Sequence, residues 1–166
     1  MAQDTAQTKE LLMQAIKSEI DGQRFYNYLA KMTSNDDARR KLANLAGDEV
    51  RHEKALREIY NKIYGEKDIA LPQHGVGVLS KFFEHPEGHE DMTERQYIDL
   101  AIEAELAATN YYKAEAARAD SDEFKKIFER MAAEEYSHFE LLQAEKDALS
   151  GNYYWFSFDD TSPMEE

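Results

Sequence analysis

The sequence contains no cysteine and few helix-breaking residues, with only 3 prolines and 7 glycines among 166 residues. The absence of cysteine excludes disulfides, thiolate zinc sites, cysteine-bound iron–sulfur clusters and thiol catalysis, and it fits a reducing compartment. Scarce proline and glycine, together with a charged fraction of 33%, favour long amphipathic helices over a sheet protein. At this length we expect a single domain, residues 1–166, whose core needs no covalent cross-links.

Basic residues are also few, because 20 Lys and Arg stand against 34 Asp and Glu and give a formal net charge of −14. A surface of this sign repels phosphate groups, so nucleic-acid binding is not expected. No apolar run approaches the roughly 18 residues that would suggest a membrane span. The polar N-terminus lacks the basic and apolar regions of a signal peptide. We therefore expect a soluble, cytoplasmic protein that binds neither nucleic acid nor membranes.

Apolar residues recur with helical spacing in segments at about residues 8–32, 35–64, 93–118 and 121–150. The first and last pairs are joined by short connections, which predicts two antiparallel hairpins. Between them, residues 66–92 are interrupted by proline and glycine, which indicates a long crossover with one short helix near residues 76–83. An aromatic tail covers residues 152–166, and its cluster Tyr153–Phe158 is interpreted as a packing strip that docks on the bundle or on a partner subunit. The prediction is an all-α four-helix bundle with a crossover between its second and third helices.

One motif, a glutamate followed thirty residues later by Glu-x-x-His, occurs twice with a constant offset of 86 residues. The Glu and His of Glu-x-x-His lie on one helix face and can reach the same point. Together the copies supply four carboxylates and two imidazoles, the ligand set of a dinuclear carboxylate site inside a four-helix bundle. The predicted metal ligands are Glu19, Glu49, His52, Glu105, Glu135 and His138.

A metal pair would balance the charge of these carboxylates. A desolvated carboxylate is unfavourable unless it is paired, protonated or bound to a metal. Oxygen and imidazole ligands suit iron or manganese, with zinc possible. Each residue taken alone has an ordinary alternative, an exposed ion pair for a glutamate and a hydrogen-bonded core residue for a histidine. The joint pattern favours the metal site.

Several neighbouring residues are interpreted with these ligands. Tyr26 and Tyr112 follow the helix glutamates by two turns on the same face, so their hydroxyls are expected to hydrogen-bond ligand carboxylates. The alternative is a core aromatic whose hydroxyl finds another partner. Glu53, Glu103 and Glu134 flank the predicted ligands off the apolar stripe and are interpreted as solvated.

At these residues the sequence resembles the ferritin-like superfamily and, within it, the rubrerythrin family of di-iron proteins. The resemblance covers about residues 8–150 and rests on two Ala-Ile-x-x-Glu motifs, each followed by an aromatic pair, and on the two Glu-x-x-His motifs. It implies that Glu49 and Glu135 bridge two irons, while the other Glu and His of each copy complete one iron each. It also implies two-electron reduction of hydrogen peroxide or dioxygen, and a homodimer.

The chain departs from this family pattern in two ways. It lacks the cysteine-rich rubredoxin domain, so electrons are expected from a separate, rubredoxin-like donor protein. Many members carry a further glutamate three residues after the third-helix ligand, where this chain has Ala108, whose repeat mate is Gly22. The site is therefore symmetric, closer to bacterioferritin-type centres.

The leading hypothesis from the sequence is a di-iron oxidoreductase that removes peroxide. Three alternatives stay open: a ferroxidase that feeds iron storage, an oxygenase with an organic substrate, and a metal-free or zinc-bound helical interaction module. The oxygenase is disfavoured because Leu, Ile and Tyr are expected to fill the helix seams and leave no pocket beside the metals.

Overall fold

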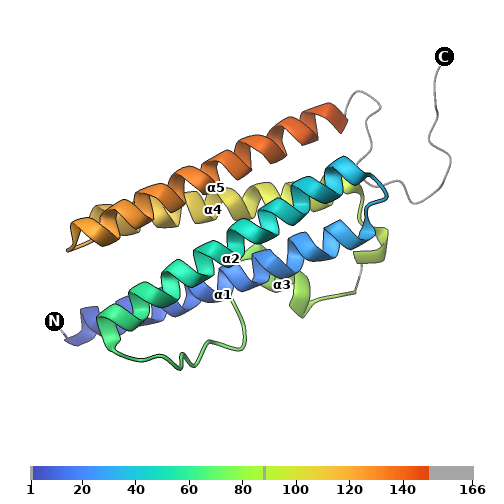
Figure 1. The fold of residues 1–166 in the computed structure, drawn as a ribbon. Helices are drawn as coiled ribbons and strands as arrows, with labels where there is room; N and C mark the ends of the chain where they lie inside the picture. The colour runs from blue at the N-terminus through green and yellow to red at the C-terminus, as the bar shows by residue number, and fades with distance from the viewer. Residues whose placement is uncertain (1, 88, 150–166) are drawn as a thin grey trace, which may run out of the picture.

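The computed structural model describes residues 2–87 and 89–149, which fold into two antiparallel helical hairpins lying against each other as two layers (Figure 1). The first hairpin joins α1 to α2 and the second joins α4 to α5. No strand occurs in these residues, and the predicted all-α bundle is confirmed. The α-helices are α1 (Ala2–Met32), α2 (Asp36–Tyr64), α3 (Val78–Glu84), α4 (Glu94–Arg118) and α5 (Asp122–Ala148).

Local signals set the helix ends. The Asn35 side chain accepts hydrogen bonds from the first turn of α2, and Gly65 ends that helix in the left-handed conformation, with φ 70°. Thr93 and Gln96 form a reciprocal capping box at the start of α4. At the N-terminus, α1 already begins at Ala2, earlier than the start near residue 8 that the apolar stripe indicated.

The crossover determines the direction of the second hairpin. Figure 1 shows the chain returning from the end of α2, past α3 and a short 3-10 turn (His89–Asp91), to the opposite end of the bundle where α4 starts. As a result α2 and α4 run in the same direction, as the predicted crossover requires. None of the helices in the described part of the chain is long and apolar enough to cross a membrane. The aromatic tail lies outside the described residues.

The apolar core is divided into two clusters, one toward each end of the bundle. One cluster gathers the end of α1 and the starts of α2 and α4, with Phe25, Leu42 and Ile98 fully buried. The other gathers the start of α1 and the end of α2, with Ile16 and Leu56 fully buried. Between these clusters lies a layer of buried polar side chains. Apolar packing therefore shields this layer from water in the direction of both ends of the bundle.

Candidate metal centre

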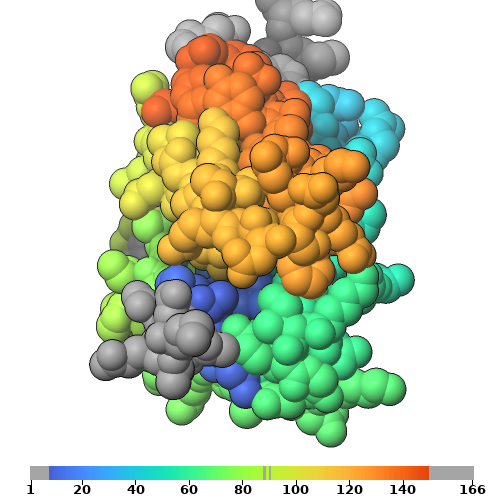
Figure 2. Space-filling model, turned by 90° about the vertical axis from the view of Figure 1, so that its left-hand side faces the viewer, coloured from blue at the N-terminus to red at the C-terminus, as the bar shows by residue number. Residues whose placement is uncertain are grey.

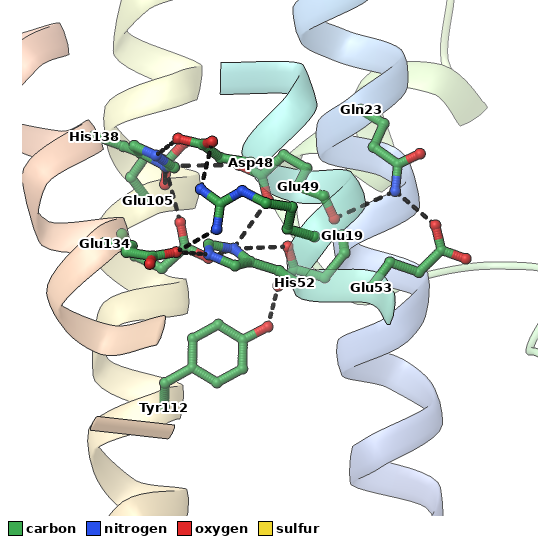
Figure 3. A network of polar contacts seen from close by, with 12 residues as sticks. Glu19, Gln23, Asp48, Glu49, His52, Glu53, Glu105, Tyr112, Glu134 and His138 are labelled. Atoms are coloured by element: carbon green, nitrogen blue, oxygen red, sulfur yellow. Dashed lines mark hydrogen bonds and ion pairs between the residues drawn. The ribbon is translucent and has the colours of Figure 1, made fainter. Parts of the chain in front are cut away.

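The six predicted ligands meet in that polar layer and all are buried. Figure 3 shows five of them, namely Glu19, Glu49, His52, Glu105 and His138. They form two groups, and in each group one ligand atom per residue lies within 4.8 Å of the others. Bonds of about 2.0–2.2 Å would place opposite ligands of one ion about 4.0–4.4 Å apart, so each group is close to the size of a coordination sphere. The groups are Glu19, Glu49, His52 and Glu135, and Glu49, Glu105, Glu135 and His138.

Two glutamates are shared between these groups. Glu49 comes from α2 and Glu135 from α5, so one carboxylate of each hairpin stands between the two positions. The remaining ligands of each group are one glutamate and one histidine. The structure thus reproduces the arrangement that the family resemblance implied, and the role of the six residues as ligands stays a prediction.

Orphaned polar atoms show that these side chains fit a bound cation. Glu19 Oε2, His52 Nδ1 and Glu135 Oε1 are buried without a hydrogen-bond partner. The His52 nitrogen is only 2.9 Å from the Glu135 oxygen and 3.5 Å from the Glu19 oxygen. These separations are short, but the atoms are not aligned for hydrogen bonds to one another, so they converge on a common point. A cation there would satisfy all three atoms.

The outer nitrogen of each histidine is held by an acidic side chain of the opposite hairpin. His52 Nε2 lies 2.7 Å from Glu134 Oε2 on α5, and His138 Nε2 lies 3.0 Å from Asp48 Oδ2 on α2. With Nε2–H donating to a carboxylate, each ring presents an unprotonated Nδ1 to a metal, an arrangement that also raises ligand basicity. The two rings lie nearly parallel, with centroids 6.1 Å apart.

Glu134 is therefore not simply solvated, and this interpretation from the sequence was wrong. Its side chain is only 28% exposed, because the contact with His52 draws it toward the centre. Arg51 links both outer acids, with nitrogens 2.6 Å from Asp48 and 3.2 Å from Glu134. Although burial acts in the opposite direction, hydrogen bonds from Arg51 and His138 lower the pKa of Asp48.

The sequence interpretation did not include Asp48 and gave Glu134 the wrong role, although a signal was present. Asp48 and Glu134 each directly precede the glutamate of a Glu-x-x-His motif, and they are related by the same offset of 86 residues. Of the other two flanking acids, Glu103 is exposed, as interpreted. The side chain of Glu53 is only 20% exposed and accepts hydrogen bonds from Gln23 and Arg57, so its interpretation as solvated was also wrong.

The two tyrosines reach across to the opposite hairpin. The hydroxyl of Tyr26 on α1 donates to Glu105 on α4, and that of Tyr112 on α4 donates to Glu19 on α1. Both rings are about 1% exposed. Burial, and then the negative charge of the bonded glutamate, raise the pKa of both phenols well above the usual value, so both hydroxyls keep their protons as donors. The expected hydrogen bonds to predicted ligand carboxylates are present.

The proton affinities in the layer reflect crowded negative charge. Burial, followed by the charges of Glu135 and Glu19, raises the pKa of Glu49 well above its usual range. Burial is also the main cause that raises the pKa of Glu105 to about 8. Hydrogen bonds to the neighbouring carboxylates overcome the effect of burial and raise the pKa of His138 to about 10. Without metal, protons therefore balance charge that a cation would otherwise balance.

A cavity of about 440 Å³ adjoins the carboxylates on the side opposite the outer acids. It lies between α1, α4 and the start of α3, and its lining includes Tyr26, Tyr112 and four of the predicted ligands. Figure 2 looks onto one end of the bundle and shows the α4 and α5 hairpin lying above α1 and α2. Because this cavity reaches four of the predicted ligands, the expectation that the helix seams leave no pocket beside the metals was wrong.

A family model described as Rubrerythrin matches residues 10–92 and 96–160. The chain belongs to the rubrerythrin family. This confirms the resemblance seen in the two Glu-x-x-His motifs, and it places a rubrerythrin-family domain around the buried carboxylate and histidine cluster.

Two similar proteins have names that state no activity. The uncharacterized protein YhjR of Bacillus subtilis (strain 168) is 24% identical over 127 residues, which cover 76% of this chain and 78% of YhjR. The solved structure of the hypothetical protein Pfu-1136390-001 from Pyrococcus furiosus superposes with a TM-score of 0.72 at 28% identity, covering 89% of this chain and 92% of that one.

Proposed function

We propose that the protein is a non-haem di-iron oxidoreductase that reduces hydrogen peroxide, with dioxygen as the alternative oxidant. The observation that carries this proposal is the pair of buried groups that share Glu49 and Glu135, because shared carboxylates hold two metal ions next to each other. Iron is the metal that membership of the rubrerythrin family suggests. When bound, a pair of ferrous ions supplies the two electrons that reductive cleavage of an O–O bond needs.

The protein's own residues prepare the site for this chemistry. The outer acids Asp48 and Glu134 fix the orientation and tautomer of the histidines. Tyr26 and Tyr112 hold the two unshared glutamates from the other side. The apolar clusters above and below exclude bulk water, while the cavity between α1 and α4 gives an oxidant access to the carboxylates.

Electrons are proposed to come from a separate donor protein, because the sequence contains no cysteine for an electron-transfer cluster of its own. Assembly as a homodimer is part of the same proposal.

The test is to load the protein with Fe(II) under anaerobic conditions and mix it separately with hydrogen peroxide and with dioxygen. Ferric absorption is followed in wild type, in Glu49→Gln and in the matched variant Glu129→Gln, which removes an exposed acid of α5. Much faster oxidation by peroxide is expected in wild type and Glu129→Gln, with little bound iron to oxidise in Glu49→Gln. Faster oxidation by dioxygen would favour a ferroxidase or oxygenase, and equal iron content in all three proteins would contradict the site.

A further inference from the structure

The cavity beside the carboxylates is much larger than hydrogen peroxide or dioxygen requires. Its volume of about 440 Å³ falls within the range of about 300–1,000 Å³ of sites that bind small organic molecules. Most of its surface is apolar, supplied by residues such as Leu11, Ala15, Val78 and Leu79. A molecule of two oxygen atoms would leave most of these walls in contact with water.

Small residues next to the predicted ligands create this space. Gly22 and Ala108 both line the cavity, and each lies three residues after a helix glutamate, on the same helix face. A Cβ atom at Gly22 would lie 3.3 Å from the side chain of Glu49, so the cavity reaches the shared carboxylates without a side chain between. On α4, Ala104 also lines the cavity, and its small side chain takes up little of the space.

Two buried acceptor atoms in the cavity lining lack a hydrogen-bond donor. Asp21 is 1% exposed, and its Oδ2 has no hydrogen-bond partner, while Oδ1 pairs with Lys17. The buried Oε1 of Gln14 likewise has no partner. Both residues line the cavity. A buried acceptor without a donor is unfavourable, so these two atoms favour a water molecule or a hydroxyl donor beside them over a cavity filled by hydrocarbon alone.

We propose that the cavity binds the apolar body of an organic hydroperoxide, with the hydroperoxide group directed toward the four carboxylates. This inference rests on the proposed function and specifies its substrate class. In the reaction the O–O bond of ROOH breaks, two electrons come from the external donor protein, and two protons are taken up. The six predicted ligands would hold the metal pair that supplies this redox chemistry when bound. The products are the alcohol ROH and one water molecule.

Binding can be measured without any turnover. The probe is 2-phenyl-2-propanol, the alcohol that corresponds to cumene hydroperoxide, titrated into the zinc-loaded full chain by calorimetry and ligand-observed NMR. Ala108→Leu and Ala104→Leu fill the cavity, whereas Ala114→Leu places the same side chain on an exposed position of α4 outside it. Bound zinc and circular dichroism are recorded for every variant, so that a misfolded protein is recognised.

We expect wild type and Ala114→Leu to bind the alcohol, and both cavity variants to bind it at least about tenfold more weakly. Absence of binding to wild type, or equal binding by all folded variants, would overturn the proposal. Cumene hydroperoxide and hydrogen peroxide are then compared as substrates of the iron-loaded chain. The cavity variants should lower the rate with cumene hydroperoxide relative to the rate with hydrogen peroxide. Consumption of hydrogen peroxide alone would overturn the substrate class but leave the proposed function standing, and consumption of neither would overturn both.

Discussion

Asp48 on α2 lies 3.0 Å from the outer ring nitrogen of His138 on α5 and thereby connects the two hairpins through the candidate metal centre. The same relationship recurs in the opposite direction between Glu134 and His52, at 2.7 Å. In each pair an acid of one hairpin contacts a histidine of the other, so each hairpin orients a predicted metal ligand of its neighbour. On the α1 and α4 side, the two buried tyrosines likewise donate hydrogen bonds across the hairpins, Tyr26 to Glu105 and Tyr112 to Glu19.

These contacts between the hairpins predict the effect of removing an outer acid. Asp48→Asn or Glu134→Gln should weaken binding of Fe(II) or Zn(II) by about 10–100-fold, because the imidazole loses its charged partner and fixed tautomer. Glu129→Gln, on an exposed face of α5, is the matched control. Metal affinity is measured by competition with a chelator, and affinities equal to that of the control would show that the outer acids do not act on the site.

The shared carboxylate Glu49 should contribute little to stability without metal but should be needed for the stabilisation that metal binding provides. Burial and neighbouring negative charge raise its pKa, so the metal-free fold already favours the neutral group, which glutamine resembles. We expect Glu49→Gln to change the metal-free stability by less than about 1 kcal/mol. Wild type should instead gain about 2.7 kcal/mol for each bound ion at a metal concentration a hundred times its Kd.

Thermal unfolding with and without Zn(II) measures this difference for Glu49→Gln and wild type. The variant should lose most of the metal-induced rise in Tm. A full rise in the variant would show that the carboxylate of Glu49 does not bind the metal.

The pairing of the six predicted ligands could be foreseen from sequence, because helical spacing places the Glu and His of each motif on one face and the repeat fixes their level. The cavity could not, because it depends on how far α1 and α4 stand apart, which no local pattern encodes. The partnership of Glu134 with His52 likewise depends on how α5 faces α2. The pattern of apolar residues along its own helix shows only that Glu134 lies outside the apolar stripe, and it does not identify a partner on another helix.

Metal binding should strengthen as the pH rises. Near pH 7 the metal-free site holds protons, because the pKa of Glu105 is raised to about 8 and that of His138 to about 10. A metal must displace these protons, so the apparent affinity should increase between about pH 6 and 9 and protons should be released on binding. Calorimetry in buffers of different ionisation enthalpy counts the protons, and an affinity that does not change with pH would contradict the protonated resting state.

The buried tyrosines should stabilise the fold even before metal binds. Tyr26→Phe and Tyr112→Phe each leave a buried glutamate without its hydroxyl donor, which should lower the free energy of unfolding of the metal-free protein by about 1–3 kcal/mol. Tyr136→Phe is the control, because that ring is 42% exposed. Urea unfolding provides the measurement. Variants no less stable than the control would show that these hydrogen bonds contribute little to the fold.

Gly22 and Gly47 make a matched pair of helical glycines that should respond in opposite ways to a methyl group. A Cβ at Gly47 meets nothing within 4 Å, so Gly47→Ala should stabilise α2 by up to about 1 kcal/mol through helix propensity alone. A Cβ at Gly22 would lie 3.3 Å from Cγ and Cδ of Glu49 and must push this carboxylate away from its shared position. Gly22→Ala should therefore bind metal more weakly than wild type, while Gly47→Ala binds it unchanged. Equal affinities in the chelator competition would mean that Glu49 has room to adjust, and that the close approach of α1 does not set its position.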